Sequence, residues 1–152
     1  MGKYSWMKIA EGEKGIKEIT GLSSHTPRIL EYHATTTLKA KQDEVPWCSS
    51  FVNWVVERAG YKGTGSAAAK SWAKWGVECP MQVGCLVVLK RTGGHHVGFY
   101  TGEKGDSIYL LGGNQSNKVC VSLFKKSLIL STRLPKVLNE QDKAIFDVIG
   151  IK

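Results

Sequence analysis

The chain has 152 residues, of which 42% are hydrophobic and 22% are charged, so one domain with a substantial core is expected. The formal net charge of +8 favours a polyanionic partner or surface, which nucleic acid, anionic lipid or an acidic cell envelope would each supply. The sequence has no polybasic tract, no apolar window long enough to span a bilayer and no apolar core of a signal peptide, which predicts synthesis in the cytoplasm without a signal peptide and without a membrane span.

Helical patterns fill the first half of the chain. Apolar residues recur within them at helical spacing, and glycine, proline or capping residues bound them. A polar stretch at residues 37–46 interrupts the series and predicts a loop. The predicted helices cover residues 6–20, 27–36, 47–59 and 67–75.

After Pro80 the pattern changes to short apolar runs separated by glycine-rich or polar turns, which is typical of antiparallel strands. Helices followed by strands predict an α+β fold, and the spacing of the strands suggests an antiparallel meander or small barrel. Residues 136–152 are predicted to be a C-terminal extension, which is a helix, a strand or a loosely held tail. The predicted strands are 84–90, 96–102, 107–113, 118–124 and 128–134.

Cys48 stands just before the apolar helical run in "PWCSSFVNWVVERAG". A helix N-terminus lowers the pKa of a thiol because its unpaired N–H groups and its dipole favour an anion. The backbone amides of Cys48 and Ser49 would also be free to donate to an oxyanion. These features predict a nucleophile that iodoacetamide alkylates before the other thiols, although a buried packing cysteine has the same local pattern.

The other three cysteines, Cys79, Cys85 and Cys120, are interpreted as structural. Cys85 and Cys120 fall within apolar strands, and Cys79 and Cys85 would pair across a turn if the protein were exported. No C-x-x-C spacing occurs, so a structural zinc site is not expected, and no other metal or cofactor is predicted.

A cysteine nucleophile needs a base, and His96 opens the apolar strand "HVGFY" directly after "TGG". The adjacent His95 should point to the opposite face of the strand, so only one of the two rings can face Cys48. Asn114 and Gln115 follow two glycines at the end of the next strand. An amide oxygen there can accept the imidazole N–H, while plain turn chemistry is the alternative for Asn114.

Taken in this order, "PWC" with "FVNW", "HVGFY" and "GGNQ" resemble a bacterial and phage group of cell-wall hydrolases. That group belongs with the CHAP (cysteine, histidine-dependent amidohydrolase/peptidase) and NlpC-type papain-like enzymes. The resemblance covers about residues 8–135, and the papain-like domain is therefore predicted at 1–135. It implies a papain-like α+β fold, with N-terminal helices packed on a five- to six-stranded antiparallel sheet or half-barrel. It also implies that Cys48 is the nucleophile, His96 the base and Asn114 the residue that orients the base.

Several residues near these positions are candidates for substrate binding. Gln42 lies roughly where papain-like enzymes often place an oxyanion-hole side chain, and Trp47 is a candidate for lining a glycan or peptide cleft. Gln115 is a candidate for a hydrogen bond to substrate or to a loop. Asp43 and Glu44 are candidates for contacting a substrate amine.

The resemblance implies peptidoglycan as the substrate, cleaved at the lactyl–alanine amide or at a bond within the stem peptide. The predicted mechanism starts from a thiolate–imidazolium pair of Cys48 and His96 and ends with hydrolysis of a thioester. The protein would be a phage endolysin or a secreted antibacterial effector, delivered by a holin or a secretion system to the cell wall. An effector would have an immunity or inhibitor protein as a further partner.

Three other classes of function stay open at this point. The chain would be a catalytically inactive papain-like binding module of an envelope or phage-tail assembly, or a thiol amidohydrolase that acts on another amide. A small basic nucleic-acid-binding domain is the third class. It lacks any stacking-aromatic or basic motif, so nucleic acid is not an expected partner.

Overall fold

The computed structural model describes residues 3–18, 26–36 and 47–149. Its helices are α1 (Ser5–Gly12), α2 (Pro27–His33), α3 (Cys48–Arg58) and α4 (Glu140–Ile149), with 3-10 helices η1 (Ala69–Lys74) and η2 (Lys126–Leu128). Its strands are β1 (Val77–Glu78), β2 (Leu86–Arg91), β3 (Gly94–Lys104), β4 (Ser107–Gln115), β5 (Lys118–Lys125) and β6 (Ile129–Leu134). These elements confirm the predicted α+β class.

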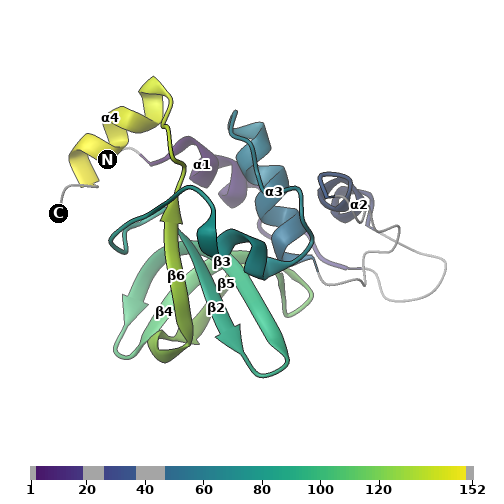
Figure 1. Cartoon of the computed structure of the whole chain (residues 1–152). Helices are drawn as coiled ribbons and strands as arrows, with labels where there is room; N and C mark the ends of the chain where they lie inside the picture. The colour runs from purple at the N-terminus through teal and green to yellow at the C-terminus, as the bar shows by residue number, and fades with distance from the viewer. Residues whose placement is uncertain (1–2, 19–25, 37–46, 150–152) are drawn as a thin grey trace.

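The strands form one antiparallel sheet with the order β1-β6-β2-β3-β4-β5. Figure 1 shows α1, α2 and α3 on one side of this curved sheet, and α4 near the N-terminal helix. Residues 86–89 of β2 are fully buried, as their unbroken apolar run requires of a strand covered on both faces. The five predicted strands are confirmed. The two-residue β1 was not predicted, because two exposed residues carry no periodic signal.

Helix α3 is attached to the sheet by its apolar stripe. Phe51, Val52, Val55 and Val56 are fully buried. The Phe51 ring meets Phe99 of β3 edge to face, with 6.4 Å between the ring centroids. Burial of each such side chain stabilises the fold by about 1.5–3 kcal/mol, so this stripe holds α3 on the sheet.

Gly113 lets β4 approach the start of α3. A Cβ atom at this position would lie 2.7 Å from the Cβ of Phe51 and 2.7 Å from the ring of Trp47. Contacts this short are not tolerated in a close-packed interior, so only glycine fits here. The second glycine of "LLGGNQ" therefore brings the end of β4 next to the first turn of α3.

Two predicted helices differ from the observed ones. Helix α1 ends at Gly12 instead of near residue 20, and Gly15 adopts a left-handed φ of 98°, which stops the helix from continuing. The predicted helix 67–75 is the shorter 3-10 helix η1. The Ser66 carbonyl accepts hydrogen bonds from the side chains of Ser49 and Asn53, so the preceding backbone is tied to α3 rather than starting an α-helix.

Of the three forms predicted for the C-terminal segment, the helix is observed. Asp142 of α4 is fully buried. Its carboxylate accepts hydrogen bonds from the backbone N–H and the hydroxyl of Ser5, both at 2.6 Å, and from the Tyr61 hydroxyl. None of the helices in the described ranges is long and apolar enough to cross a membrane.

Candidate active site

Cys48 is the first residue of α3, and its side chain is only 8% exposed. The backbone amides of Val97, Ser49 and Cys48 itself approach the sulfur and lower the pKa of the thiol. These N–H groups are candidate donors to an oxyanion formed beside the sulfur. The side chain of Ser49 is occupied elsewhere: its hydroxyl donates to the Ser66 carbonyl and accepts from the Trp72 indole, so only its backbone is available at the site.

Burial raises the pKa of the Cys48 thiol, and this effect outweighs the amides and the Arg91 guanidinium, which lower it. The prediction of a lowered thiol pKa is therefore wrong in direction. The sequence shows that Cys48 starts a helix, but it does not show how deeply the sulfur is covered. The resting thiol is protonated at neutral pH.

His96 is held by Gln115 rather than by Asn114. The Nε2 atom of His96 lies 2.8 Å from Oε1 of Gln115, and both side chains are buried. The ring also lies against Phe124 of β5, with 5.1 Å between the ring centroids. An amide of the "GGNQ" motif does contact the imidazole, as predicted, but it belongs to the second of the two amide residues.

The hydrogen bonds of Gln115 define the protonation of the His96 ring. The Gln115 amide group donates to the carbonyl of Leu110 at 3.1 Å and to the carbonyl of Cys120 at 2.7 Å. Its nitrogen is thereby fixed as the donor, so Oε1 must accept from Nε2–H of His96. In the neutral ring the lone pair is then on Nδ1, which is the nitrogen available to take a proton.

Burial lowers the pKa of His96 to about 4, with the Arg91 guanidinium adding to the effect and the Gln115 hydrogen bond opposing it. The imidazole is therefore neutral at neutral pH. Together with the protonated Cys48 thiol, this replaces the predicted thiolate–imidazolium pair by a neutral pair in the resting protein.

Two adjoining hollows lie at this end of the sheet. The first, of about 300 Å³, is lined by Cys48, Arg91–His95 and Asn114. The second, of about 220 Å³, contains His96 and Gln115 and is bounded by residues of β5. Arg91 and Asn114 line both hollows.

The two histidines therefore border different hollows, as their opposite directions on the strand require. His95 shares a hollow with Cys48. His96 directly precedes Val97 in the chain, and the backbone amide of Val97 reaches the sulfur of Cys48. Among the described residues, no hydrogen bond joins Cys48 to either ring. Asn114 has a left-handed φ of 57° and lines both hollows. Among the described residues, no hydrogen bond joins Asn114 to the His96 ring.

The candidate substrate-binding residues have different outcomes. Trp47 is fully buried, its indole N–H donates to Glu18, and it lines neither hollow, so the structure places it in the core rather than at a cleft. Its size and its contact with Gly113 account for this, since the tight approach of β4 covers the ring. Gln42, like Asp43 and Glu44, lies outside the described residues.

Arg91 was not singled out by sequence reasoning, although it immediately precedes the turn that leads to the two histidines. Arg91 is exposed at the end of β2, and its sequence context does not distinguish it from any other surface arginine. Only the hairpin geometry, which returns the chain from β2 to β3, brings it beside both hollows.

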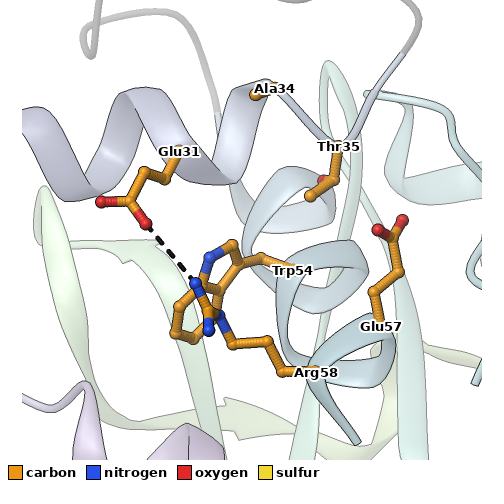
Figure 2. Close-up of a pocket in the computed structure, with 6 residues that line it drawn as sticks. All are labelled: Glu31, Ala34, Thr35, Trp54, Glu57 and Arg58. Atoms are coloured by element: carbon orange, nitrogen blue, oxygen red, sulfur yellow. Dashed lines mark ion pairs between the residues drawn. The ribbon is translucent and has the colours of Figure 1, made fainter. Parts of the chain in front are cut away.

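A larger hollow, of about 430 Å³, lies between α2 and α3 and does not include Cys48 (Figure 2). The Trp54 ring forms its floor, with the Arg58 guanidinium 4.3 Å from the ring centroid. Glu31 pairs with Arg58 at 3.6 Å across this hollow. Glu31 and Arg58 are therefore already engaged with each other.

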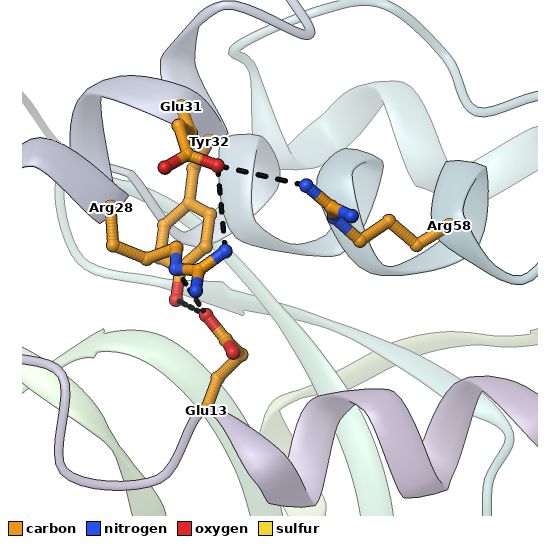
Figure 3. Close-up of polar contacts among 5 residues, drawn as sticks. All are labelled: Glu13, Arg28, Glu31, Tyr32 and Arg58. Carbon is orange, nitrogen blue, oxygen red and sulfur yellow. Dashed lines mark hydrogen bonds and ion pairs between the residues drawn. The ribbon is translucent and has the colours of Figure 1, made fainter.

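Figure 3 shows how this network continues along α2. Glu31 also pairs with Arg28, and Glu13 contacts Arg28 and accepts a hydrogen bond of 2.7 Å from the Tyr32 hydroxyl. Exposed ion pairs contribute little stability individually, but this network fixes the orientation of α2 against its neighbours. We interpret it as structural.

Groups of three or more His, Cys, Asp or Glu side chains able to hold a metal ion do not occur in the part of the chain that the structure describes.

Comparison with known protein families gives a match that covers just under half of the chain. Residues 40–114 match the CHAP domain family. The P60 domain of an antigen from M. avium subspecies paratuberculosis has a similar structure, with a TM-score of 0.56 and 17% identity over 89% of this chain and 94% of that one. That similarity shows the fold. No curated protein matches the sequence.

A second similar structure is a protein described as similar to a lipoprotein of the NLP/P60 family from Staphylococcus aureus subsp. aureus Mu50. It has a TM-score of 0.48 and 18% identity over 87% of this chain. The match covers 41% of the staphylococcal chain, so the present chain spans less than half of that protein.

Proposed function

We propose that the chain is a peptidoglycan hydrolase of the CHAP/NlpC-type papain-like family, and that it cleaves an amide bond with Cys48 as the nucleophile. The observation that carries this proposal is the arrangement at the start of α3. A thiol is surrounded there by three backbone amides, next to a strand that carries a neutral, oriented imidazole.

In the proposed reaction His96 is the base and Gln115 is the residue that orients it. As the sulfur of Cys48 attacks the amide carbonyl, Nδ1 of His96 takes the thiol proton, and backbone amides hold the oxyanion. The imidazolium then gives its proton to the leaving amine as the C–N bond breaks. Water adds to the thioester with the same imidazole as base, which releases the acid and restores the thiol.

The biological setting is proposed as a phage endolysin or a secreted antibacterial effector. Either would be carried to the cell wall by a holin or a secretion system, and an effector would be accompanied by an immunity or inhibitor protein. The bond cleaved is the lactyl–alanine amide or a bond in the stem peptide. The net charge of +8 supports this setting, because anionic envelope polymers attract a basic protein.

Two observations favour a second candidate, an inactive binding module of an envelope or phage-tail assembly. The thiol is almost covered, and its hollow is lined by His95 instead of the buried His96. A binding module needs no contact between a thiol and an imidazole. A thiol amidohydrolase acting on another amide would use the same arrangement as the hydrolase.

Digestion of purified sacculi distinguishes these functions. The wild-type protein is incubated with sacculi under reducing conditions, and soluble fragments are identified by mass spectrometry, which also names the bond. Cys48→Ala is expected to release no fragments, while Cys79→Ala, which removes a thiol outside both hollows, is expected to act like the wild type. Binding to sacculi without release of fragments by the wild type would favour the binding module.

Separate substitution of the two histidines tests the choice of base. His96→Ala is expected to abolish release of fragments, and His95→Ala to retain most of it. The reverse result would make His95 the base, which its position in the hollow of Cys48 would allow. Activity of the wild type on a small amide but not on sacculi would support a thiol amidohydrolase that acts on another amide.

A further inference from the structure

The most notable charged group near Cys48 that the proposed reaction does not use is Arg91. It is exposed at the end of β2 and lines both hollows, between the thiol on one side and the His96–Gln115 pair on the other. Its guanidinium lowers the pKa of both Cys48 and His96, which places its charge within reach of each.

In the part of the chain that the structure describes, Arg91 lacks a partner of opposite charge. Within the described residues it forms neither an ion pair nor a hydrogen bond, whereas Arg28 and Arg58 each pair with Glu31. The described residues that line the two hollows include no aspartate or glutamate. The two joined hollows therefore contain an unneutralised guanidinium among neutral polar side chains.

A guanidinium presents several N–H donors in one plane, which matches the two oxygens of a carboxylate. From this geometry we infer that Arg91 is a specificity-determining residue that binds a free carboxylate of the substrate next to the scissile amide. This inference rests on the proposed peptide hydrolysis at Cys48, and it names the substrate class as peptides that carry an anionic group close to the cleaved bond.

The neighbouring Lys90 offers a matched control. It is also exposed and basic, but successive side chains of a strand point to opposite faces, and Lys90 lines neither hollow. Lys90→Gln and Arg91→Gln remove the same charge from the same strand. A general electrostatic effect on a negatively charged substrate would change both variants, whereas a carboxylate site would change only Arg91→Gln.

The test uses three synthetic stem tetrapeptides with lysine at the third position. One has both carboxylates free, one has the glutamyl carboxylate converted to an amide, and one has the C-terminal carboxylate converted to an amide. For the wild type, one of the two amidated peptides is expected to lose about 10- to 100-fold in kcat/KM, the effect of one charge-assisted hydrogen-bonded pair. Arg91→Gln is expected to cleave the free and amidated forms equally well, and Lys90→Gln to keep the wild-type preference.

Binding to the inactive Cys48→Ala protein separates this inference from the proposed function. Calorimetry with the same peptides is carried out with and without the added Arg91→Gln change. If no peptide is cleaved but the carboxylate preference in binding depends on Arg91, the carboxylate site stands and the hydrolase function fails. Equal cleavage or binding of the free and amidated peptides by protein that retains Arg91 would overturn the inference. A preference for the free carboxylate that survives Arg91→Gln, or that Lys90→Gln also abolishes, would overturn it as well, and so would the absence of binding to any peptide.

Discussion

Acidification from about pH 7 to pH 4 is expected to destabilise the protein through His96. Its pKa is about 4 in the folded chain, against an ordinary value of 6.5. The unfolded chain therefore binds a proton as the pH falls through 6.5, while the folded chain stays neutral until about pH 4. Stability is lost across this window, by about 3 kcal/mol at pH 4, because each pH unit between the two pKa values contributes about 1.4 kcal/mol.

Urea unfolding followed by tryptophan fluorescence measures this contribution. His96→Gln removes the titrating ring but keeps an N–H group able to donate to Gln115. The loss of unfolding free energy between about pH 7 and pH 4 is expected to be about 3 kcal/mol smaller in His96→Gln than in the wild type. His95→Gln, on the other face of the strand, leaves the surroundings of His96 unchanged and is expected to keep the wild-type pH dependence. Identical pH dependence in His96→Gln and the wild type would refute the claim that burial controls this imidazole.

Three further predictions concern the site and its support. Gln115→Glu places a carboxylate at the imidazole N–H and is expected to move the acid limb of kcat/KM upward by about one pH unit or more, while Asn114→Asp moves it less. Asp142→Asn is expected to lower the unfolding free energy by about 2 kcal/mol, since a buried carboxylate that accepts three hydrogen bonds is lost. Iodoacetamide near pH 7 is expected to label Cys79 before Cys48, because a hydrogen bond from Cys85 lowers the pKa of Cys79 and burial raises that of Cys48, as peptide mapping by mass spectrometry will show.

Each of these predictions has an outcome that contradicts it. A larger shift of the acid limb in Asn114→Asp would return the orienting role to Asn114. Unchanged unfolding of Asp142→Asn would mean that the hydrogen bonds to this carboxylate add no stability to the fold. Labelling of Cys48 first would restore the low thiol pKa that the helix start alone predicts.

The fold was predictable because its two strongest signals are periodic. The apolar stripe of 47–59 predicted a helix that is found at Cys48–Arg58, and the turn-bounded apolar runs predicted the strands. A helix with one apolar face, followed by short strands of which β2 is buried on both faces, leaves few alternatives to an α+β arrangement. The boundaries of α1 and η1 were not predictable, because they depend on hydrogen bonds to distant segments. The N–H of Gly15, after α1, donates to the Val119 carbonyl, and the Ser66 carbonyl, before η1, accepts from side chains of α3.

The choice between Asn114 and Gln115 was beyond the sequence. Successive residues of a regular strand point to opposite faces, so either amide could have faced the histidine strand. The structure decides through a shift of register between Gly112 and Gln115 and through the left-handed conformation of Asn114. Both features depend on how β4 and β5 pair, and neither leaves a pattern in the order of residues.

The two pKa effects of Arg91 determine how its removal should act on catalysis. The guanidinium favours the Cys48 thiolate and disfavours the His96 imidazolium, so its effects on the two partners of the proton transfer oppose each other. Its main contribution to the proposed reaction is then the binding of a substrate carboxylate, which is made before and during the chemical step alike. Arg91→Gln is therefore expected to raise KM for the carboxylate-bearing peptide while kcat changes little. A fall in kcat at unchanged KM would show that the guanidinium acts on the reacting groups instead, and single-turnover measurements with saturating peptide would separate the two effects.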